Sequence, residues 1–237
     1  MKKIVILPTY QEKENCEKIY KLIRKYNSKI SILFVDDNSP DGTGKIIKNL
    51  KKKDRSLFLE VRKKKKGIGS AHKYGIRWAL KKNFKIIVTM DADLTHNPKI
   101  IPKMLSLTEK FDLIQTNRFL MKDSIKDWTL LRKLMTNIRF ILIKYLLGME
   151  YDTSGAFRCY NFNKINPKHL LETKDDSYSF FWESSFLLNE RKYTIFELPI
   201  KLPKRVSGYS KMNTSDWISG VIHLLAIFAK YKVLNKK

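Results

Sequence analysis

Short apolar runs alternate with segments of helical spacing along the first half of this chain, and this alternation constrains the fold most. The runs are rich in isoleucine, valine and leucine, as buried strands are. They lie at residues 4–7, 31–35, 57–61, 85–90 and 112–115. Candidate helices lie between them, at residues 15–26, 43–52, 67–82 and 98–110. Strands that alternate with helices predict an α/β fold with a parallel sheet.

Polar and acidic residues stand directly after several of the apolar runs. They are Tyr10 and Glu12 after the first run, Asp36 and Asp37 after the second, and Asp91 and Asp93 after the fourth. Ligands of parallel sheets bind beyond the carboxyl ends of the strands. The sequence therefore predicts that these side chains converge on one site.

Asp91 and Asp93 are two residues apart, so alternation along an extended backbone would place them on the same side. Two carboxylates at a loop suit a Mg²⁺ or Mn²⁺ ion that also binds substrate phosphates, because Mg²⁺ rarely takes a cage of protein ligands alone. Taken alone, the spacing is better explained by an acidic turn that ends a strand. The convergence of three strand ends favours the metal site.

The pattern Gly67-x-Gly69 follows a basic run at residues 62–66. It does not fit the phosphate-binding loop that ends in Gly-Lys-Ser or Gly-Lys-Thr, and the third glycine falls too late, at Gly75, for a dinucleotide fingerprint. The sequence predicts a flexible entry into a helix here.

The chain has 237 residues, of which 43% are hydrophobic, and this suffices for one sizeable domain or a domain with an appendage. We expect a domain at residues 1–215 and a C-terminal helical segment at 216–237. Two cysteines make no disulfide framework and lack metal-ligand spacing. A reducing, cytosolic location is therefore expected. The N-terminal apolar run is too short for a signal peptide and is expected to be the first strand.

The net charge is +25, from 48 lysines and arginines against 23 acidic residues. Such a balance favours a polyanionic partner, such as nucleic acid, an anionic membrane or a phosphorylated substrate. A lysine-rich composition that merely solvates the surface explains the total charge equally well.

Three separated motifs then occur in a fixed order. They read Pro-Thr-Tyr-Gln-Glu-Lys-Glu-Asn at residues 8–15, Val-Asp-Asp-Asn-Ser-Pro-Asp-Gly-Thr at 35–43 and Asp-Ala-Asp-Leu at 91–94. This set resembles the inverting family-two glycosyltransferases, and among them the dolichol-phosphate (polyprenol-phosphate) mannose synthases. The resemblance extends over residues 3–212. It implies a GT-A-type nucleotide-sugar-binding sandwich with a central, mainly parallel sheet.

The same resemblance implies a donor site for GDP-mannose. The residues that match its guanosine and donor contacts are Pro8, Tyr10, Glu12, Val35, Asp37 and Ala92. Asp91 and Asp93 match the aspartates that hold Mg²⁺ or Mn²⁺ and the diphosphate. Thr95 stands where a further metal ligand, often Gln or Ser, occurs, although a hydroxyl is a shorter and weaker ligand than an amide oxygen. Arg205 and Lys211 match cations that close over the diphosphate.

For the acceptor, the resemblance assigns Arg118, Arg132 and Thr136 to the phosphate of a polyprenyl or dolichyl phosphate. The acceptor is already an anionic nucleophile, so one in-line displacement without a strong general base would invert the sugar. Without the motifs, the arginines would be read as ordinary surface cations. A further motif at residues 152–158 resembles a family pattern in a different register, and the roles of its residues stay open.

Two segments bear on the membrane in which such an acceptor lies. Residues 128–147 form a candidate amphipathic helix with a basic and an apolar face, which fits the membrane interface. Packing on the domain's own core explains the pattern equally well. Residues 217–229 are apolar but too few to span a bilayer, so we expect an interfacial or partner-docking helix. A peripheral enzyme at the cytoplasmic face of a membrane is expected, with a small membrane-embedded protein as one conceivable partner.

Two other functions stay open at this point. A UDP-glucose:polyprenyl-phosphate glucosyltransferase, or another family-two enzyme, would keep the fold and change the substrates. A basic module that binds nucleic acid or anionic membrane is the alternative from another class. No nucleic-acid-binding motif fits the chain, and acidic strand ends would repel phosphate in the absence of a metal.

Overall fold

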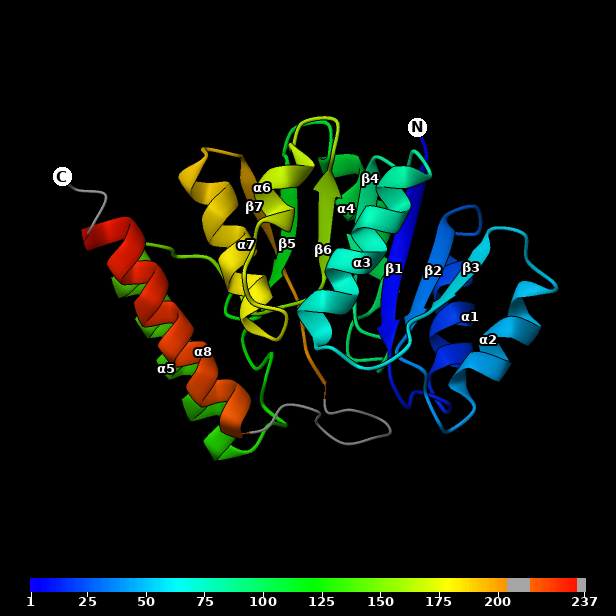
Figure 1. Cartoon of the computed structure of the whole chain (residues 1–237), viewed down its shortest axis with the longest axis horizontal. Coiled ribbons are helices and arrows are strands. Elements are labelled where there is room, and N and C mark those ends of the chain that lie inside the picture. Colours follow the sequence, from blue (N-terminus) through cyan, green and yellow to red (C-terminus); the bar gives the residue numbers. More distant parts are fainter. Residues whose placement is uncertain (204–213, 234–237) are drawn as a thin grey trace.

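In residues 1–203 and 214–233, which the computed structural model describes, seven strands form one sheet in the order β3-β2-β1-β4-β6-β5-β7 (Figure 1). The strands are β1 (Lys3–Thr9), β2 (Ser31–Asp36), β3 (Leu57–Val61), β4 (Ile86–Thr89), β5 (Leu113–Asn117), β6 (Arg158–Asn161) and β7 (Ile195–Pro199). β6 runs antiparallel to β4 and β5, and the other paired strands are parallel. The expected α/β fold with a mainly parallel sheet is confirmed.

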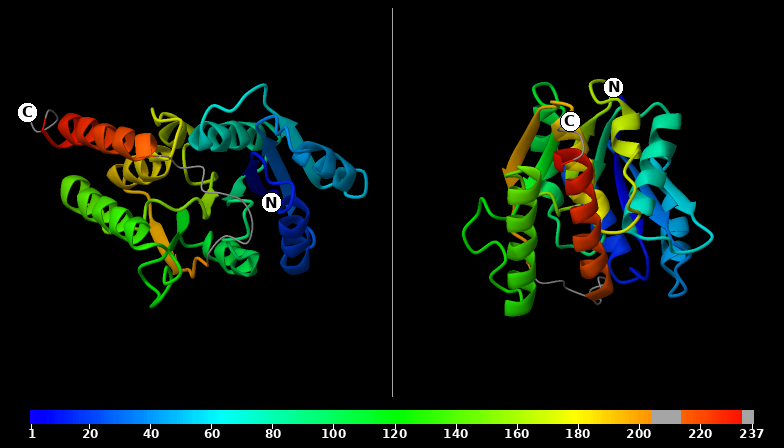
Figure 2. Two further views of the ribbon diagram at one scale, coloured as in Figure 1. Left: turned by 90° about the horizontal axis from the view of Figure 1, so that it is seen from below. Right: turned by 60° about the vertical axis from the view of Figure 1, so that its left-hand side comes forward.

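Helices cover both faces of this sheet (Figures 1 and 2). One face carries α1 (Cys16–Tyr26), α2 (Thr43–Lys51), a 3₁₀ turn η1 (Pro98–Ile100) and α4 (Ile101–Leu107); the other carries α3 (Ile68–Lys81), α6 (Pro167–Leu171) and α7 (Ser179–Glu190). Alternate side chains of the central strands point into the two cores on opposite faces of the sheet. Val5 and Leu7 of β1 pack with α1, whereas Ile4 and Ile6 pack with α3.

Two further helices pair beside the sheet. They are α5 (Leu130–Leu147) and α8 (Thr214–Phe228), and α8 continues into a π-helical turn, η2 (Ala229–Val233) (Figure 2). A third apolar cluster joins Ile143 and Leu147 of α5, Phe186 of α7, and Leu224 and Ile227 of α8. Within the described ranges, no helix combines the length and the apolar composition that crossing a bilayer requires.

The helix expected at residues 98–110 is shorter and divided. A 3₁₀ turn occupies Pro98–Ile100, and the α-helix covers only Ile101–Leu107. Pro102 has no backbone N–H and is tolerated only in the first turn of an α-helix, which explains why the α-helix begins at Ile101. At the other end, the Thr108 hydroxyl donates to the Leu105 carbonyl oxygen at 2.7 Å, where the helix ends.

Gly67 and Gly69 allow close packing between two segments. The expectation of a flexible helix entry at these glycines is therefore wrong. A Cβ atom at Gly67 would lie 2.2 Å from the Asp176 carbonyl oxygen, and one at Gly69 would lie 2.5 Å from the Phe180 Cβ atom. Gly67 also has a φ of +94°, which disfavours any other residue. The two glycines therefore let the segment before α7 lie against the start of α3.

His72 of α3 is fully buried against Phe180 and Phe181. Neither ring nitrogen has a hydrogen-bond partner among the described residues. Burial, followed by the positive charge of Arg158, lowers the pKa of His72 from 6.5 to about 3. The imidazole is therefore neutral in the folded protein at any pH where the protein is ordinarily handled.

This burial predicts a loss of stability in acid. Between pH 6.5 and pH 3 the unfolded state binds a proton at His72 that the folded state does not, so the free energy of unfolding falls as the pH drops. At pH 5 the loss is about 2 kcal/mol. Between pH 7 and pH 5, the free energy of unfolding measured in urea should fall by about 2 kcal/mol less in His72→Leu than in the wild type, so its slope against pH is flatter. An unchanged slope would contradict the burial of a neutral His72.

Candidate active site

The polar residues predicted to converge do meet, at the edge of the sheet where β1, β2 and β4 end. This edge lies at the bottom of Figure 1 and faces the viewer in the left view of Figure 2. β1 and β2 pair in parallel with Pro8 opposite Val35, which brings the two motifs side by side. Tyr10 follows β1, and the Lys65 ammonium lies 5.0 Å from the centre of its ring. Glu12 is buried and accepts a hydrogen bond from the Asn15 amide at 2.8 Å.

The adjacent carboxylates after β2 have different surroundings. Asp36 accepts hydrogen bonds from the hydroxyls of Thr9 at 3.0 Å and Ser39 at 2.6 Å, so it fixes the turn. Asp37 is buried and is held by Arg62, whose Nε and Nη2 atoms donate to its two oxygens at 2.5 and 2.7 Å. A bidentate pair of this kind fixes the plane of the carboxylate.

Arg62 also ties this carboxylate to the start of α3. Its Nη1 atom donates to the Ser70 hydroxyl at 2.8 Å. In the sequence, Arg62 belongs to a run of basic residues and nothing in the run distinguishes it. Only the parallel pairing of β2 and β3, which places Asp36 beside Val61, brings Arg62 next to Asp37.

Asp91 and Asp93 lie beyond the end of β4, which stops at Thr89. The alternation expected of an extended backbone therefore does not relate the two side chains, and Leu94 between Asp93 and Thr95 has a left-handed φ of +66°. Asp93 is buried, and its Oδ1 atom accepts from the Thr95 hydroxyl at 2.7 Å and from the Thr95 N–H at 3.1 Å. The Thr95 hydroxyl thus donates to Asp93 and orients its carboxylate.

Asp91 is the more accessible carboxylate, with 34% of its side chain exposed. Its N–H donates to Nδ1 of the buried His96 at 3.0 Å, and its Oδ2 atom lies 3.8 Å from the same nitrogen. His96 therefore supports the loop. In the described part of the chain, no group of three His, Cys, Asp or Glu side chains is placed to hold a metal. Two carboxylates fit a Mg²⁺ or Mn²⁺ ion whose other ligands come from substrate and water.

The residues assigned to the acceptor gather around Trp128, between β5 and α5. The Arg132 guanidinium carbon lies 3.6 Å from the Trp128 ring centre, and that of Arg118 lies 5.5 Å from it. Thr136 is buried one turn after Arg132. Arg118 is buried and donates from Nε to Asp152 at 2.6 Å, and from its backbone N–H to the same oxygen at 3.0 Å.

The motif at residues 152–158 lies between the carboxylates and the arginines. At one end, Asp152 holds Arg118. At the other, the Phe157 ring packs on His96 with 5.2 Å between ring centres. Gly155 approaches the Arg118 guanidinium, since a Cβ atom there would lie 3.6 Å from Nη2. The segment therefore joins the two groups into one site.

The sequence leaves the roles of the residues in this motif open and has no local signal for the buried hydrogen bonds of Arg158 and Glu197. Arg158 is fully buried and donates to the carbonyl oxygens of Gly155 at 2.9 Å and Thr153 at 2.7 Å. Glu197 of β7 accepts from the Asp152 N–H at 2.7 Å and from the Asn117 amide at 2.7 Å.

Arg205 and Lys211, the two cations expected to close over the donor diphosphate, lie outside the described residues.

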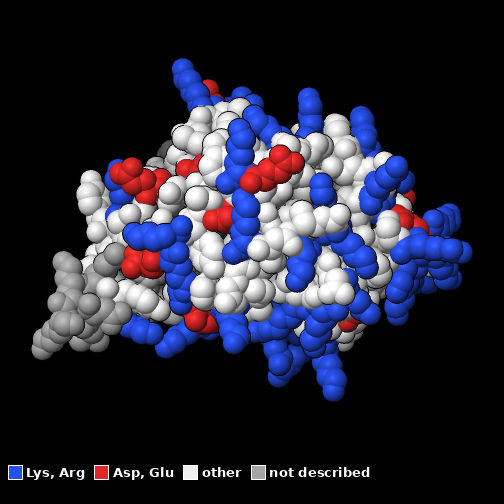
Figure 3. Space-filling view, turned by 90° about the horizontal axis from the view of Figure 1, so that it is seen from above, with Lys and Arg blue, Asp and Glu red and all other residues white. Residues whose placement is uncertain are grey.

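Basic residues are not confined to this site. Figure 3 views the opposite edge of the molecule, and lysine and arginine side chains are spread across it, with few acidic ones among them. The excess charge is therefore not confined to the edge of the sheet where the candidate site lies.

Comparison with known proteins adds a family. The sequence model of Glycosyl transferase family 2 matches residues 4–170, more than half of the chain. The chain is 28% identical to a polyprenol monophosphomannose synthase of Mycolicibacterium smegmatis over 90% of its own length and 82% of that protein. It is 29% identical to an undecaprenyl-phosphate mannosyltransferase of Micrococcus luteus, over 90% and 88% respectively.

Solved structures share the fold at low identity. Glucosyl-3-phosphoglycerate synthase of Mycobacterium tuberculosis, in complex with Mn²⁺, UDP and phosphoglyceric acid, superimposes with a TM-score of 0.68 at 14% identity, covering 96% of this chain and 78% of that one. A mannosyltransferase of Pyrobaculum calidifontis in complex with GDP-Man and Mn²⁺ gives a TM-score of 0.55 at 16% identity, covering 86% and 58%. These likenesses concern the fold.

Proposed function

Since the chain belongs to glycosyl transferase family 2 and is thus a glycosyltransferase, we propose that it transfers mannose from GDP-mannose to a polyprenyl or dolichyl phosphate, with inversion. The observation that carries the proposal is the segment 152–158, which joins a carboxylate pair to an arginine pair in one site. Such a site can hold a diphosphate through a metal and a second phosphate through arginines. Two relatives named as mannosyl transferases to polyprenol-type acceptors support the choice of substrates.

In this proposal the donor lies along the ends of β1, β2 and β4. Pro8, Tyr10, Glu12 and Val35 would surround the guanosine, with Ala92 beside the diphosphate. Asp37, held in place by Arg62, would accept a hydrogen bond from the base or the ribose. Asp91 and Asp93 would hold Mg²⁺ or Mn²⁺, which when bound neutralises the diphosphate as leaving group. Arg205 and Lys211 would add positive charge to it.

The acceptor phosphate would be held by Arg118, Arg132 and Thr136. One of its oxygens attacks the anomeric carbon as the bond from that carbon to the GDP oxygen breaks, which inverts the configuration. Arginine suits this task because its guanidinium binds a phosphate through two parallel hydrogen bonds. The Asp152 carboxylate fixes the orientation of Arg118 before the acceptor arrives.

The donor is tested by transfer assays with GDP-mannose and UDP-glucose as alternatives, each with polyprenyl phosphate and Mn²⁺. Labelled lipid from GDP-mannose supports the proposal. Labelled lipid from UDP-glucose alone would leave the fold and the acceptor in place and would overturn the assignment of the donor.

We also propose that α5 and α8 lie at the cytoplasmic surface of a membrane. Leu130, Leu131 and Leu134 are 83%, 67% and 57% exposed, and Ile218 and Ile222 of α8 are 54% and 63% exposed. Thr136 lies on the packed side of α5. Clustered exposed apolar side chains mark an interaction surface, and lysines near them would favour anionic lipid. A small membrane-embedded protein is the other partner that this surface suits.

Replacing Leu130, Leu131 and Leu134 together with serine should weaken binding to anionic vesicles by about 1,000-fold or more, because each leucine that enters the acyl region contributes roughly 1.5–3 kcal/mol. Flotation of the protein with vesicles measures this. The matched control is Val61→Ser, which removes an exposed apolar side chain from β3. Equal flotation of the triple variant and the wild type would contradict the membrane role of α5.

A further inference from the structure

A third arginine, Arg139, lies on the same side of α5 as Arg132 and Thr136. The spacings are four residues from Arg132 to Thr136 and three from Thr136 to Arg139, so the three side chains follow one another along one stripe of the helix. Arg139 is half-buried. No motif in the sequence distinguishes it from the other 47 lysines and arginines, of which there are 48 in all.

Arg139 differs in its contacts from Arg62, Arg118 and Arg158. Arg62 is bound to Asp37, Arg118 is bound to Asp152, and Arg158 donates to several carbonyl oxygens. Across residues 1–203 and 214–233, by contrast, no hydrogen bond or ion pair is found for Arg139. The charged groups that act on it are two cations, Arg118 and Arg132, and one anion, Asp152. A guanidinium charge that is partly withdrawn from water beside two other cations is costly.

Burial first, and then the charge of Arg118, lowers the pKa of Arg139 from 12.5 to about 10. Arg139 is still protonated at neutral pH. Its charge is therefore present and is opposed by its surroundings.

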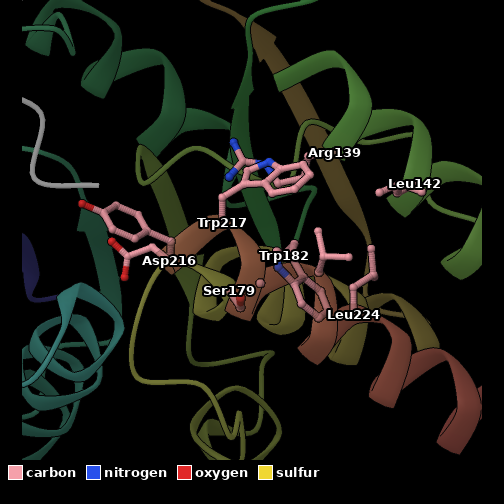
Figure 4. A pocket seen from close by; sticks show the side chains of 10 residues that line it. Arg139, Leu142, Ser179, Trp182, Asp216, Trp217 and Leu224 are labelled. Atoms are coloured by element: carbon pink, nitrogen blue, oxygen red, sulfur yellow. The ribbon is translucent and has the colours of Figure 1, made fainter. Parts of the chain in front are cut away.

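The side chain borders a small cavity between α5, α7 and α8 (Figure 4). In Figure 4, Arg139 and Trp217 lie together at one end of the group, and Ser179, Trp182 and Leu224 lie at the other. The Trp217 Nε1 atom is buried and has no hydrogen-bond partner in the described residues. Asp216 also lines the cavity, and its carboxylate accepts from the Ser177 hydroxyl at 3.4 Å.

Arg139 and the Trp217 indole, neither of which has a hydrogen-bond partner for its N–H groups in the described residues, therefore line the same cavity. The cavity volume is about 20 Å³, which is room for one water molecule. A water would satisfy the indole but would leave the charge of Arg139 uncompensated. An anion beside the stripe, where Arg132 and Thr136 already point to a phosphate, would compensate it.

We propose that Arg139 is a third cation that binds the phosphate of the acceptor, together with Arg118 and Arg132. The inference rests on the proposed function, since it takes the acceptor to be a phosphate monoester. A monoester carries close to two negative charges at neutral pH, which suits a site with more arginines than carboxylates. Arg139 would extend the phosphate site one turn along α5 toward α8.

The test measures both the apparent affinity for the acceptor and the thermal stability of the protein. In Arg139→Met the Michaelis constant for polyprenyl phosphate should rise about 10- to 100-fold, while that for the sugar donor stays unchanged. The melting temperature without ligand should rise, by about 2–4 °C, because an uncompensated charge has been removed. Arg139→Lys should restore part of the affinity, since it keeps the charge and loses the planar fork. Arg77→Met, at an exposed arginine of α3, is the matched control.

A purely structural role would give the opposite stability result, because loss of a packing residue lowers the melting temperature. A lower melting temperature together with an unchanged acceptor constant would overturn the inference. Thermal shifts with farnesyl phosphate, farnesol and inorganic phosphate then test the role of Arg139 separately from the proposed function. Stabilisation of the wild type by farnesyl phosphate that is lost in Arg139→Met supports it.

Equal stabilisation of both proteins by farnesyl phosphate would overturn the role of Arg139 and leave the proposed acceptor standing. No stabilisation of the wild type by farnesyl phosphate would overturn the proposed acceptor as well. Inorganic phosphate could stabilise the wild type as strongly as farnesyl phosphate does, with both effects abolished in Arg139→Met. In that case Arg139 binds the phosphate group, and the prenyl chain contributes no affinity at this residue. Farnesol, which lacks the phosphate, should have no effect that depends on Arg139.

Discussion

Replacing Asp93 with asparagine is expected to lower the rate of the proposed mannosyl transfer by roughly a thousandfold and to leave the fold unchanged. The Asp93 carboxylate accepts two hydrogen bonds from Thr95, and an asparagine amide oxygen can accept the same two. The loop therefore keeps its shape. What is lost is a negative charge that would hold a divalent metal beside the leaving diphosphate.

The measurement is the turnover number with saturating donor, acceptor and Mn²⁺, together with the melting temperature. The comparison variant is Thr95→Val, which removes the hydroxyl and keeps the Asp93 charge. It should reduce turnover by about tenfold, because Asp93 loses one of its two orienting hydrogen bonds. A variant Asp93→Asn that turns over at the wild-type rate would show that this carboxylate holds no metal needed for the reaction.

The second large effect concerns stability. Asp152→Asn should lower the free energy of unfolding by about 3–5 kcal/mol, because it leaves the buried Arg118 without its counter-charge. The ion pair is 2.6 Å long, and the side chains of Arg118 and Asp152 are 7% and 2% exposed. Burial raises the pKa of Asp152, but the charge and hydrogen bonds of Arg118 outweigh burial and hold that pKa below its usual value.

Urea unfolding at neutral pH measures this effect, and a double variant controls for it. Arg118→Met combined with Asp152→Asn removes both charges, so it should recover much of the stability that Asp152→Asn loses, while transfer to polyprenyl phosphate stays low. If Asp152→Asn is as stable as the wild type, the Arg118–Asp152 pair is not the buried, mutually dependent pair described here.

The first half of the fold follows from local sequence patterns. The strand at Leu57–Val61 and the helices α1, α2 and α3 lie within two residues of their expected limits. The second half does not follow. Ten consecutive residues of α7, from Ser179 to Leu188, are buried, so the helix has no polar face to reveal its period.

The same distinction applies to the site. Asp37, Asp91 and Asp93 could be predicted from the sequence motifs because each follows a strand within a few residues. The residues that orient these groups are distant in sequence: Arg62 is 25 residues from Asp37, and Asp152 is 34 residues from Arg118. Such pairs depend on which strands become neighbours, and the insertion of the antiparallel β6 between β4 and β5 has no local signal.

One reaction tests the proposed transfer: labelled GDP-mannose, polyprenyl phosphate in detergent and purified protein, with Mn²⁺ or Mg²⁺ and then with a chelator. We expect label in the lipid phase that depends on metal and is absent with Asp93→Asn. If the label fails to reach the lipid under any of these conditions while the protein is folded and the donor intact, the proposed transfer is wrong.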